Sequence, residues 1–269
     1  MPSGWDTVPD TDREWRVLGE KDPYWGVITH DKYRLNNLTE ESVEEFYDTG
    51  ERYTDRLLET IRVRLDPDFA PATALDFGCG VGRVLIPLAR RCEEAVGVDV
   101  SQGMLDVART RCDAVGVSNA RLIAGGDALS NLSRTFDLVH AFIVLQHVPP
   151  VRGMQILRRL VELVGERGVG VLHVGYGESE ALARAGAGPR SAARQFVRRI
   201  ARPLVARLRP RAERSGPAPV RSFEYDLNAA FAILQEAGIR RMHVEFTDHA
   251  GLYGVMMFFR RSQEAGYMA

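Results

Sequence analysis

Short apolar runs alternate with helical patterns between residues 72 and 176, and this alternation limits the folds open to the chain. The apolar runs lie at 72–77, 94–99, 120–124, 136–142 and 169–176. Each has the length of a buried strand, and segments with apolar residues three or four apart separate them. Parallel strands need a crossover connection, which is usually a helix. The order therefore predicts a parallel sheet covered by helices on both faces.

The flanking segments complete this organisation. A helical pattern runs from Thr39 to about Arg64 and ends before Pro67, whereas residues 1–38 suggest an irregular arm fixed by aromatic side chains. A helix is expected after Asp226, and two strands follow at 241–247 and 253–260. We divide the chain into an arm with a helix at 1–69, expected to act as a lid, and a domain at 70–269 with a basic insertion at about 178–225.

The composition limits the class of protein and the cellular compartment that we expect. Of the 269 residues, 45% are hydrophobic and 26% are charged, as in an ordinary soluble globular chain. No apolar run reaches the ~20 residues of a membrane span, and the N-terminus lacks a secretory signal pattern. The cysteines at 79, 92 and 112 form no CxxC pair. We therefore expect a reduced, cytoplasmic protein.

A glycine-rich loop follows the first apolar run and opens a helical segment. It reads Asp76-x-Gly78-x-Gly80-x-Gly82. Such a loop brings backbone N–H groups and the positive end of a helix to a ligand, and glycine permits the left-handed turns. A dinucleotide-binding loop would have its third glycine at 83, where this chain has Arg83. The spacing therefore disfavours a pyrophosphate ligand.

This loop resembles the first motif of the class I S-adenosylmethionine-dependent methyltransferases. The resemblance continues through the runs that end at Asp99, Asp127 and Phe142, in consistent order over about residues 70–175. It implies a Rossmann-like, doubly wound α/β fold: a mostly parallel seven-stranded sheet with an antiparallel last strand, a helical N-terminal arm and an insertion after strand five. S-adenosyl-L-methionine is the implied cofactor.

The resemblance also implies where the cofactor binds. It assigns contacts to Asp76, Gly78, Cys79, Gly80, Arg83, Asp99, Val100, Met104, Gly126, Asp127, Ala128 and Phe142. Asp99 would hold the ribose hydroxyls and Asp127 would receive the adenine amino group. Arg83 has two readings: it reaches the methionine carboxylate, or it pairs with a neighbouring acid.

Methyl transfer to an amine or a hydroxyl is helped by a nearby proton acceptor. His147 follows the fourth strand and His249 lies in the turn between the last two strands, so both would face the carboxyl edge of the sheet. They are our candidate general bases. His140 and His173 lie within strands and are expected to be structural. We expect no metal site, because the spacing of His147, Asp248 and His249 does not require one.

The insertion is rich in arginine, with eleven arginines and three glutamates between Glu178 and Arg221. Its stripe of apolar residues between 197 and 208 suggests a basic amphipathic helix that Pro203 interrupts. A cover over the acceptor pocket is the first interpretation, and a homodimer contact is the second. Lysine occurs only twice in the chain against thirty-three arginines, which weakens an argument from arginine to an anionic ligand.

These features lead to one expectation and its alternatives. We expect methyl transfer to an oxygen or nitrogen of a small-molecule acceptor by in-line displacement. An RNA methyltransferase that docks through the insertion is the alternative enzyme, although no paired aromatic stacking motif supports a nucleic-acid partner. A cofactor-binding partner protein without catalysis is the alternative from another class. An NAD-dependent oxidoreductase ranks last.

Overall fold

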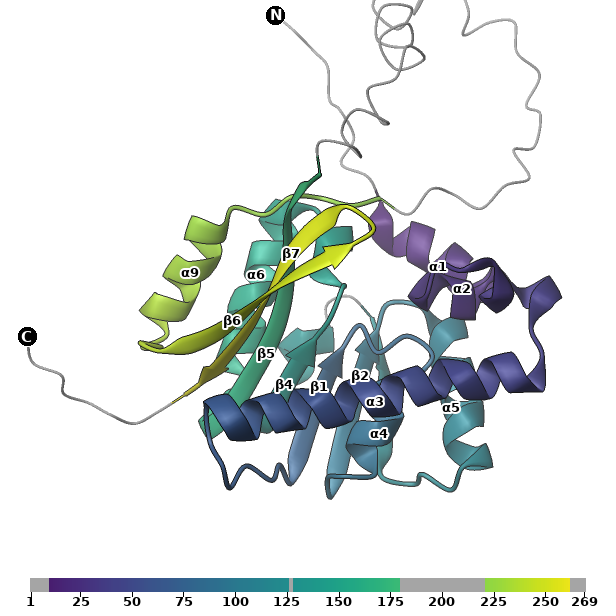
Figure 1. Ribbon diagram of the computed structural model, residues 1–269, viewed down its shortest axis with the longest axis horizontal. Helices are drawn as coiled ribbons and strands as arrows, with labels where there is room; N and C mark the ends of the chain where they lie inside the picture. The colour runs from purple at the N-terminus through teal and green to yellow at the C-terminus, as the bar shows by residue number, and fades with distance from the viewer. Residues whose placement is uncertain (1–9, 126–127, 180–220, 262–269) are drawn as a thin grey trace, which may run out of the picture.

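The computed structural model describes residues 10–125, 128–179 and 221–261 (Figure 1). A single seven-stranded sheet has the order β3-β2-β1-β4-β5-β7-β6. Its strands are β1 (Thr73–Phe77), β2 (Glu94–Asp99), β3 (Ala120–Ala124), β4 (Phe136–Ala141), β5 (Val164–Glu178), β6 (Met242–His249) and β7 (Leu252–Arg260). Strands β1 to β5 pair with one another in parallel, whereas β7 is antiparallel to both β5 and β6. The predicted sheet is confirmed.

Helices cover both faces of this sheet. The helices are α1 (Thr11–Lys21), α2 (Pro23–Val27), α3 (Glu40–Arg64), α4 (Leu85–Ala89), α5 (Gln102–Ala114), α6 (Pro150–Glu162) and α9 (Leu227–Glu236). One hydrophobic core joins the sheet to α3, α4 and α5, and a second joins its other face to α6 and α9. Short 3-10 helices occur at η1 (Asp31–Tyr33), η2 (Leu35–Asn37), η3 (Ala128–Asn131) and η4 (Leu145–His147). In the described residues, no helix has the length and hydropathy of a membrane span.

The described part of the N-terminal arm, residues 10–38, is helical, as the resemblance implies, and not irregular as the residue pattern alone suggested. Asp10 caps α1 by accepting a hydrogen bond from the Arg13 N–H at 3.0 Å. The arm approaches α5 through glycine: a Cβ at Gly19 would lie 2.9 Å from Met104 Cγ, and one at Gly26 would lie 2.9 Å from Met104 Cε. Small residues of the arm therefore make this contact with α5.

Strand β5 begins earlier than its apolar pattern predicts. The sequence places a helix end at Gly165 and a strand start at 169, but α6 ends at Glu162 and β5 starts at Val164. The pairing with β4 shifts from Phe136↔Val164 to Leu138↔Val169. The residues in between bulge out, and Arg167 has a φ of +68°. The insertion at 180–220, with its apolar stripe, lies outside the described residues.

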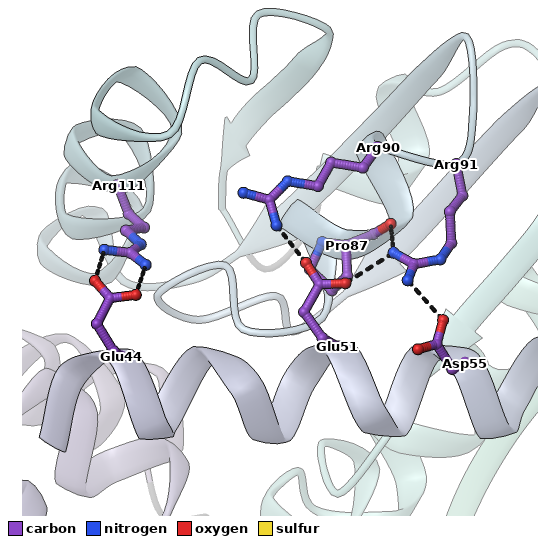
Figure 2. Close-up of polar contacts among 7 residues, drawn as sticks. All are labelled: Glu44, Glu51, Asp55, Pro87, Arg90, Arg91 and Arg111. Atoms are coloured by element: carbon purple, nitrogen blue, oxygen red, sulfur yellow. Dashed lines mark hydrogen bonds and ion pairs between the residues drawn. The ribbon is translucent and has the colours of Figure 1, made fainter. Parts of the chain in front are cut away.

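Helix α3 crosses the sheet and carries an acidic row that faces arginines of the domain (Figure 2). Glu44 binds Arg111 through two hydrogen bonds of 2.7 Å. Glu51 contacts both Arg90 and Arg91, and Asp55 lies 2.6 Å from Arg91. The helix begins with a capping box between Thr39 and Ser42. These ion pairs join α3 to α5 and to the end of α4, while the buried face of α3 packs in the hydrophobic core.

We expect Glu51→Gln to lower the free energy of unfolding by about 1 kcal/mol or less, because half-exposed ion pairs contribute ~0.2–1 kcal/mol and this one belongs to a network. The difference from wild type should shrink in concentrated salt, which screens the pairs. Urea unfolding at low and high salt measures both effects. Glu59→Gln, an exposed change on the same helix, is the control. A loss for Glu51→Gln that stays the same in high salt contradicts the electrostatic account.

Candidate functional site

The glycine loop between β1 and α4 adopts the conformation that its glycines predict. Gly78, Gly80 and Gly82 have φ values of +74°, +54° and +82°. The N–H groups of Gly78 and Cys79 donate to the Val98 carbonyl at 2.7 and 3.1 Å, which ties the loop to β2. A Cβ at Gly80 would lie 2.9 Å from Val27 Cγ2 of the arm. The loop is therefore tightly covered and leaves its backbone close to the carboxyl end of the sheet.

Asp99 lies at the carboxyl end of β2, beside this loop. Its Oδ2 accepts from the Gly80 N–H at 2.9 Å and its Oδ1 accepts from the Ser101 N–H at 2.8 Å. Burial raises the pKa of this carboxyl to about 6. A carboxylate has about four acceptor positions, so two remain for hydroxyl groups of a ligand. The geometry suits the ribose contact that the resemblance implies.

Asp76 and Arg83 each carry a buried polar atom without a partner. Asp76 Oδ1 lies 2.8 Å from His140 Nδ1, whereas Oδ2 has no hydrogen bond. Arg83 donates to Thr49 Oγ1 at 3.4 Å and lies 5.5 Å from the Tyr53 ring centre, but its Nε has no partner. Burial lowers the pKa of Arg83. Among its electrostatic neighbours Asp76 raises the pKa of Arg83 against the effect of burial, so both interpretations of Arg83 stay open.

The other expected cofactor residues are placed as follows. Cys79 is buried, and burial raises the pKa of its thiol well above the usual value. Met104 is buried beneath the arm, whereas Val100 is half-buried. Gly126 and Asp127 lie outside the described residues, and Ala128 begins η3. The adenine end of the expected site is therefore not described.

The segment after β4 packs against the glycine loop and presents an aromatic ring. A Cβ at Gly78 would lie 3.0 Å from Val144 Cβ. Ile143 has a φ of +57°, an uncommon conformation for a β-branched residue that is held only where the surroundings enforce it. Phe142 stacks on Tyr53 with ring centres 4.8 Å apart. The expected Phe142 position thus lies between the loop and helix α3.

His249 and His147 have different neighbours. The His249 ring lies 5.6 Å from both Phe142 and His173, and its Nε2 is buried without a hydrogen bond. His147 has its Nδ1 2.6 Å from the Arg221 carbonyl and its Nε2 3.4 Å from the Gln146 side-chain nitrogen. Burial lowers the pKa of both imidazoles. Both are therefore neutral at pH 7, but only His249 has an imidazole nitrogen free.

His140 and His173, which we expected to be structural, both contact residues of the candidate site. His173 Nε2 lies 2.8 Å from Thr247 Oγ1, its Nδ1 is buried without a partner, and burial lowers its pKa to about 3. His140 joins Asp76 to Tyr53, whose hydroxyl is 2.9 Å from His140 Nε2. The pairing of Asp76 with His140 follows from the register of β1 and β4. Sequence patterns do not reveal register, so this link was missed.

The arm lies across the carboxyl side of the sheet, where Figure 1 places α1 and α2. Asp12 forms a two-pronged ion pair with Arg152 at 2.6 and 2.9 Å. Trp15 contacts the edge of His147 with ring centres 5.0 Å apart, and Glu14 lies 3.2 Å from Arg221. The arm thus connects α5 to the segments that follow β4. In the described residues, no group of three His, Cys, Asp or Glu side chains could hold a metal ion.

Comparison with known proteins places this geometry in context. Residues 74–168 match the family model described as a methyltransferase domain. The chain is 38% identical over 95 residues to a ubiquinone biosynthesis O-methyltransferase of Azorhizobium caulinodans, covering 35% of this chain and 37% of that protein. It is 33% identical over 115 residues to the protein of the same name from Ruegeria, covering 43% and 41%. The chain thus matches little more than a third of these curated relatives.

Solved structures extend the likeness over more of the chain. Magnesium protoporphyrin IX methyltransferase from Synechocystis, solved with bound S-adenosylhomocysteine, has a TM-score of 0.63 at 18% identity and covers 94% of this chain and 100% of its own. An N-methyltransferase from Bradyrhizobium japonicum, also in complex with S-adenosyl-L-homocysteine, has a TM-score of 0.55 at 16% identity and covers 94% and 98%. At these identities the likeness concerns the fold.

Proposed function

The chain carries a class I S-adenosylmethionine-dependent methyltransferase domain, and from this premise we propose that it transfers a methyl group from S-adenosylmethionine to a small molecule. The observation that carries the proposal is the set of buried, partly unpartnered groups at the carboxyl ends of β1 and β2. Asp76 and Arg83 each have a free buried atom, and Asp99 has free acceptor positions beside the glycine loop. These groups match the charges and hydroxyls of the cofactor.

Each part of the cofactor has a chemical counterpart. An ammonium group suits the free Oδ2 of Asp76, and a carboxylate suits the free Nε of Arg83. Ribose hydroxyls would donate to Asp99, and the glycine loop would admit the ligand close to its backbone. Leaving Asp76 Oδ2 and Arg83 Nε buried without partners costs free energy. Binding a zwitterion between them would remove that cost.

The protein's share of the reaction is orientation and proton transfer. When bound, S-adenosylmethionine supplies a methyl group that a nucleophile can displace in line. The glycine loop, Asp99 and the arm would fix the donor and exclude water, while Phe142 and Tyr53 offer a flat aromatic surface to an acceptor. His249 lies beside Phe142 with a free ring nitrogen and is neutral at pH 7, so it can accept the proton that a hydroxyl releases.

We favour His249 over His147 as the base. Both ring nitrogens of His147 are engaged, one by the Arg221 carbonyl and the other by Gln146. The relatives that share 33–38% identity are named as O-methyltransferases, which favours oxygen over nitrogen as the acceptor atom. The lowered pKa of His249 makes it a weak base, which suits an acidic hydroxyl such as a phenol better than an aliphatic alcohol.

A thermal-unfolding experiment with S-adenosylhomocysteine tests the cofactor. At ~100 times its dissociation constant the ligand should stabilise the native state by about 2.7 kcal/mol. Folded protein without any shift would overturn the proposal. A radioactive methyl-transfer screen over phenols, alcohols, amines and total RNA then identifies the acceptor. Transfer to RNA would favour the alternative enzyme, and cofactor binding without transfer to any acceptor would favour a non-catalytic partner protein.

We expect His249→Ala to reduce kcat by about 10²- to 10⁴-fold if it removes the general base, with little change in cofactor affinity. His147→Ala is the matched comparison, since burial lowers the pKa of both imidazoles, and it should leave kcat within about tenfold. Steady-state kinetics on the identified acceptor, at pH values from 6 to 9, measure this. Equal losses in the two variants, or a larger loss for His147→Ala, would reject the assignment.

A further inference from the structure

A buried chain of hydrogen bonds runs from helix α3 to the end of β1. Tyr53 Oη lies 2.9 Å from His140 Nε2, and His140 Nδ1 lies 2.8 Å from Asp76 Oδ1. His140 is 1% exposed and Asp76 is 3% exposed, so water does not replace the bond between them, whereas Tyr53 is half-buried. The three residues come from α3, β4 and β1, and none is assigned a joint role by the family resemblance.

The proton positions in this chain follow from its two ends. The Asp76 carboxylate only accepts, so the His140 Nδ1–H must donate to it. In the tautomer with its proton at Nδ1, the ring has a lone pair at Nε2 to which the Tyr53 O–H can donate. Burial raises the pKa of Tyr53 well above its usual value, so its hydroxyl keeps the proton. Every link therefore has a donor and an acceptor, and the chain has a single direction.

At the Asp76 end of this chain of hydrogen bonds, one carboxylate oxygen has no partner. Asp76 Oδ2 is buried and has no partner, although Oδ1 of the same carboxylate is held by His140. A side chain fixed at one oxygen cannot rotate without losing a charge-assisted hydrogen bond, so the direction of the second oxygen is fixed too. The Arg83 cation lies 5.5 Å from the Tyr53 ring centre, and the charge of Asp76 acts on it to raise its pKa against the effect of burial.

We propose that His140, oriented by Tyr53, is a positioning residue that holds Asp76 so that its free oxygen receives the ammonium group of the cofactor's amino-acid portion. This inference rests on the proposed function, because it deepens the role of the same site. It assigns part of the cofactor's affinity to a histidine and a tyrosine that would not themselves touch the ligand. It also joins α3 directly to the cofactor end of the sheet.

Two ligands separate this role from a general structural one. S-adenosylhomocysteine carries the ammonium and carboxylate groups, whereas 5′-methylthioadenosine has the same nucleoside and sulfur but lacks both. His140→Leu should weaken S-adenosylhomocysteine by about tenfold or more, since a hydrogen bond to a charged group is lost. The affinity for 5′-methylthioadenosine should stay within about twofold. Calorimetric titration of both ligands measures the difference.

Two further variants complete the experiment. His140→Asn keeps a donor near the position of Nδ1 and should restore most of the affinity for S-adenosylhomocysteine. His173→Leu is the matched control: it removes an equally buried histidine that is hydrogen-bonded to a hydroxyl on the same sheet, and it should leave both affinities unchanged. Unfolding of each variant without ligand shows that it is folded before the affinities are compared.

The outcomes distinguish this inference from the proposed function. If the wild type binds neither ligand, the proposed function fails. If the wild type binds both and His140→Leu weakens both equally, or weakens neither, the positioning role is overturned while the function stands. A selective loss of S-adenosylhomocysteine binding in His140→Leu, with recovery in His140→Asn, supports the role.

Discussion

Asp99→Asn is expected to weaken S-adenosylhomocysteine by about 10²-fold or more. The carboxylate has two acceptor positions left for ribose hydroxyls, and hydrogen bonds to a charged group contribute ~1.5–3 kcal/mol each. An asparagine offers a single acceptor oxygen, and its amino group would face the N–H of Gly80 or Ser101. The loss would therefore combine the missing charge with a disturbed loop. Calorimetric titration at pH 8 measures the change in dissociation constant.

The same carboxyl predicts a pH dependence of binding. Burial raises its pKa to about 6, so the carboxylate that would accept ribose hydroxyls is about half formed at pH 6 and almost fully formed above pH 7. The wild-type affinity should be flat between pH 7 and 8 and fall about tenfold by pH 5. The affinity of Asp99→Asn should not show this fall between pH 7 and 5. Asp106→Asn, an exposed change on α5, is the control and should keep the wild-type profile. A wild-type affinity that rises towards pH 5 would contradict the assignment.

The effect of pH on folding stability that comes from Asp99 should have the opposite sign to its effect on cofactor affinity. A carboxyl whose pKa is raised in the folded state binds its proton more tightly there than in the unfolded chain. Its contribution is therefore favourable in acid and is lost as the pH rises from about 4 to about 6. The neutral buried histidines act the other way, because acid protonates them in the unfolded chain first. Affinity is thus the clearer measure of Asp99.

Phe46→Ala should lower the free energy of unfolding by about 3–5 kcal/mol. Phe46 is fully buried in α3, and its ring centre lies 5.1 Å from that of Tyr24, 5.2 Å from Tyr33 and 5.3 Å from Tyr47. Removing it leaves a cavity among aromatic residues that join the arm to the helix. Domains of this kind are stable by only ~5–15 kcal/mol, so the loss is a large fraction of the total.

Urea unfolding checks this prediction. Val63→Ala is the control, because Val63 lies on the same helix and is 67% exposed, and it should change stability by about 0.5 kcal/mol or less. A loss below about 1 kcal/mol for Phe46→Ala would mean that α3 is not anchored through this residue. Tyr24 and Tyr47 pack edge-on against Phe46.

The sheet could be predicted from the sequence because its information is local. The strands at 94–99 and 120–124 have the predicted bounds, since each is a short apolar run with clear ends. Asp226 caps the helix that was expected to follow it. The loop glycines were also readable, because positive φ angles demand a specific residue type.

The rest of the site depends on contacts between distant residues. The link from Asp76 to His140 needs the register of β1 and β4, and its continuation to Tyr53 needs the position of α3. His249 reaches Phe142 and His173 because the β6–β7 hairpin folds back beside β5. The contact of the arm with Met104 also joins distant segments, and glycines of the arm make it. No pattern within one segment contains this information.

The buried thiol of Cys79 has a practical consequence. Its pKa is raised by burial and by the neighbouring carboxyls of Asp99 and Asp76, so almost no thiolate forms at neutral pH. Because the thiolate is the species that alkylating reagents attack, Cys79 should react only when the loop between β1 and α4 opens to solvent. The rate at which Cys79 of the wild-type protein is alkylated should therefore measure how often this loop opens.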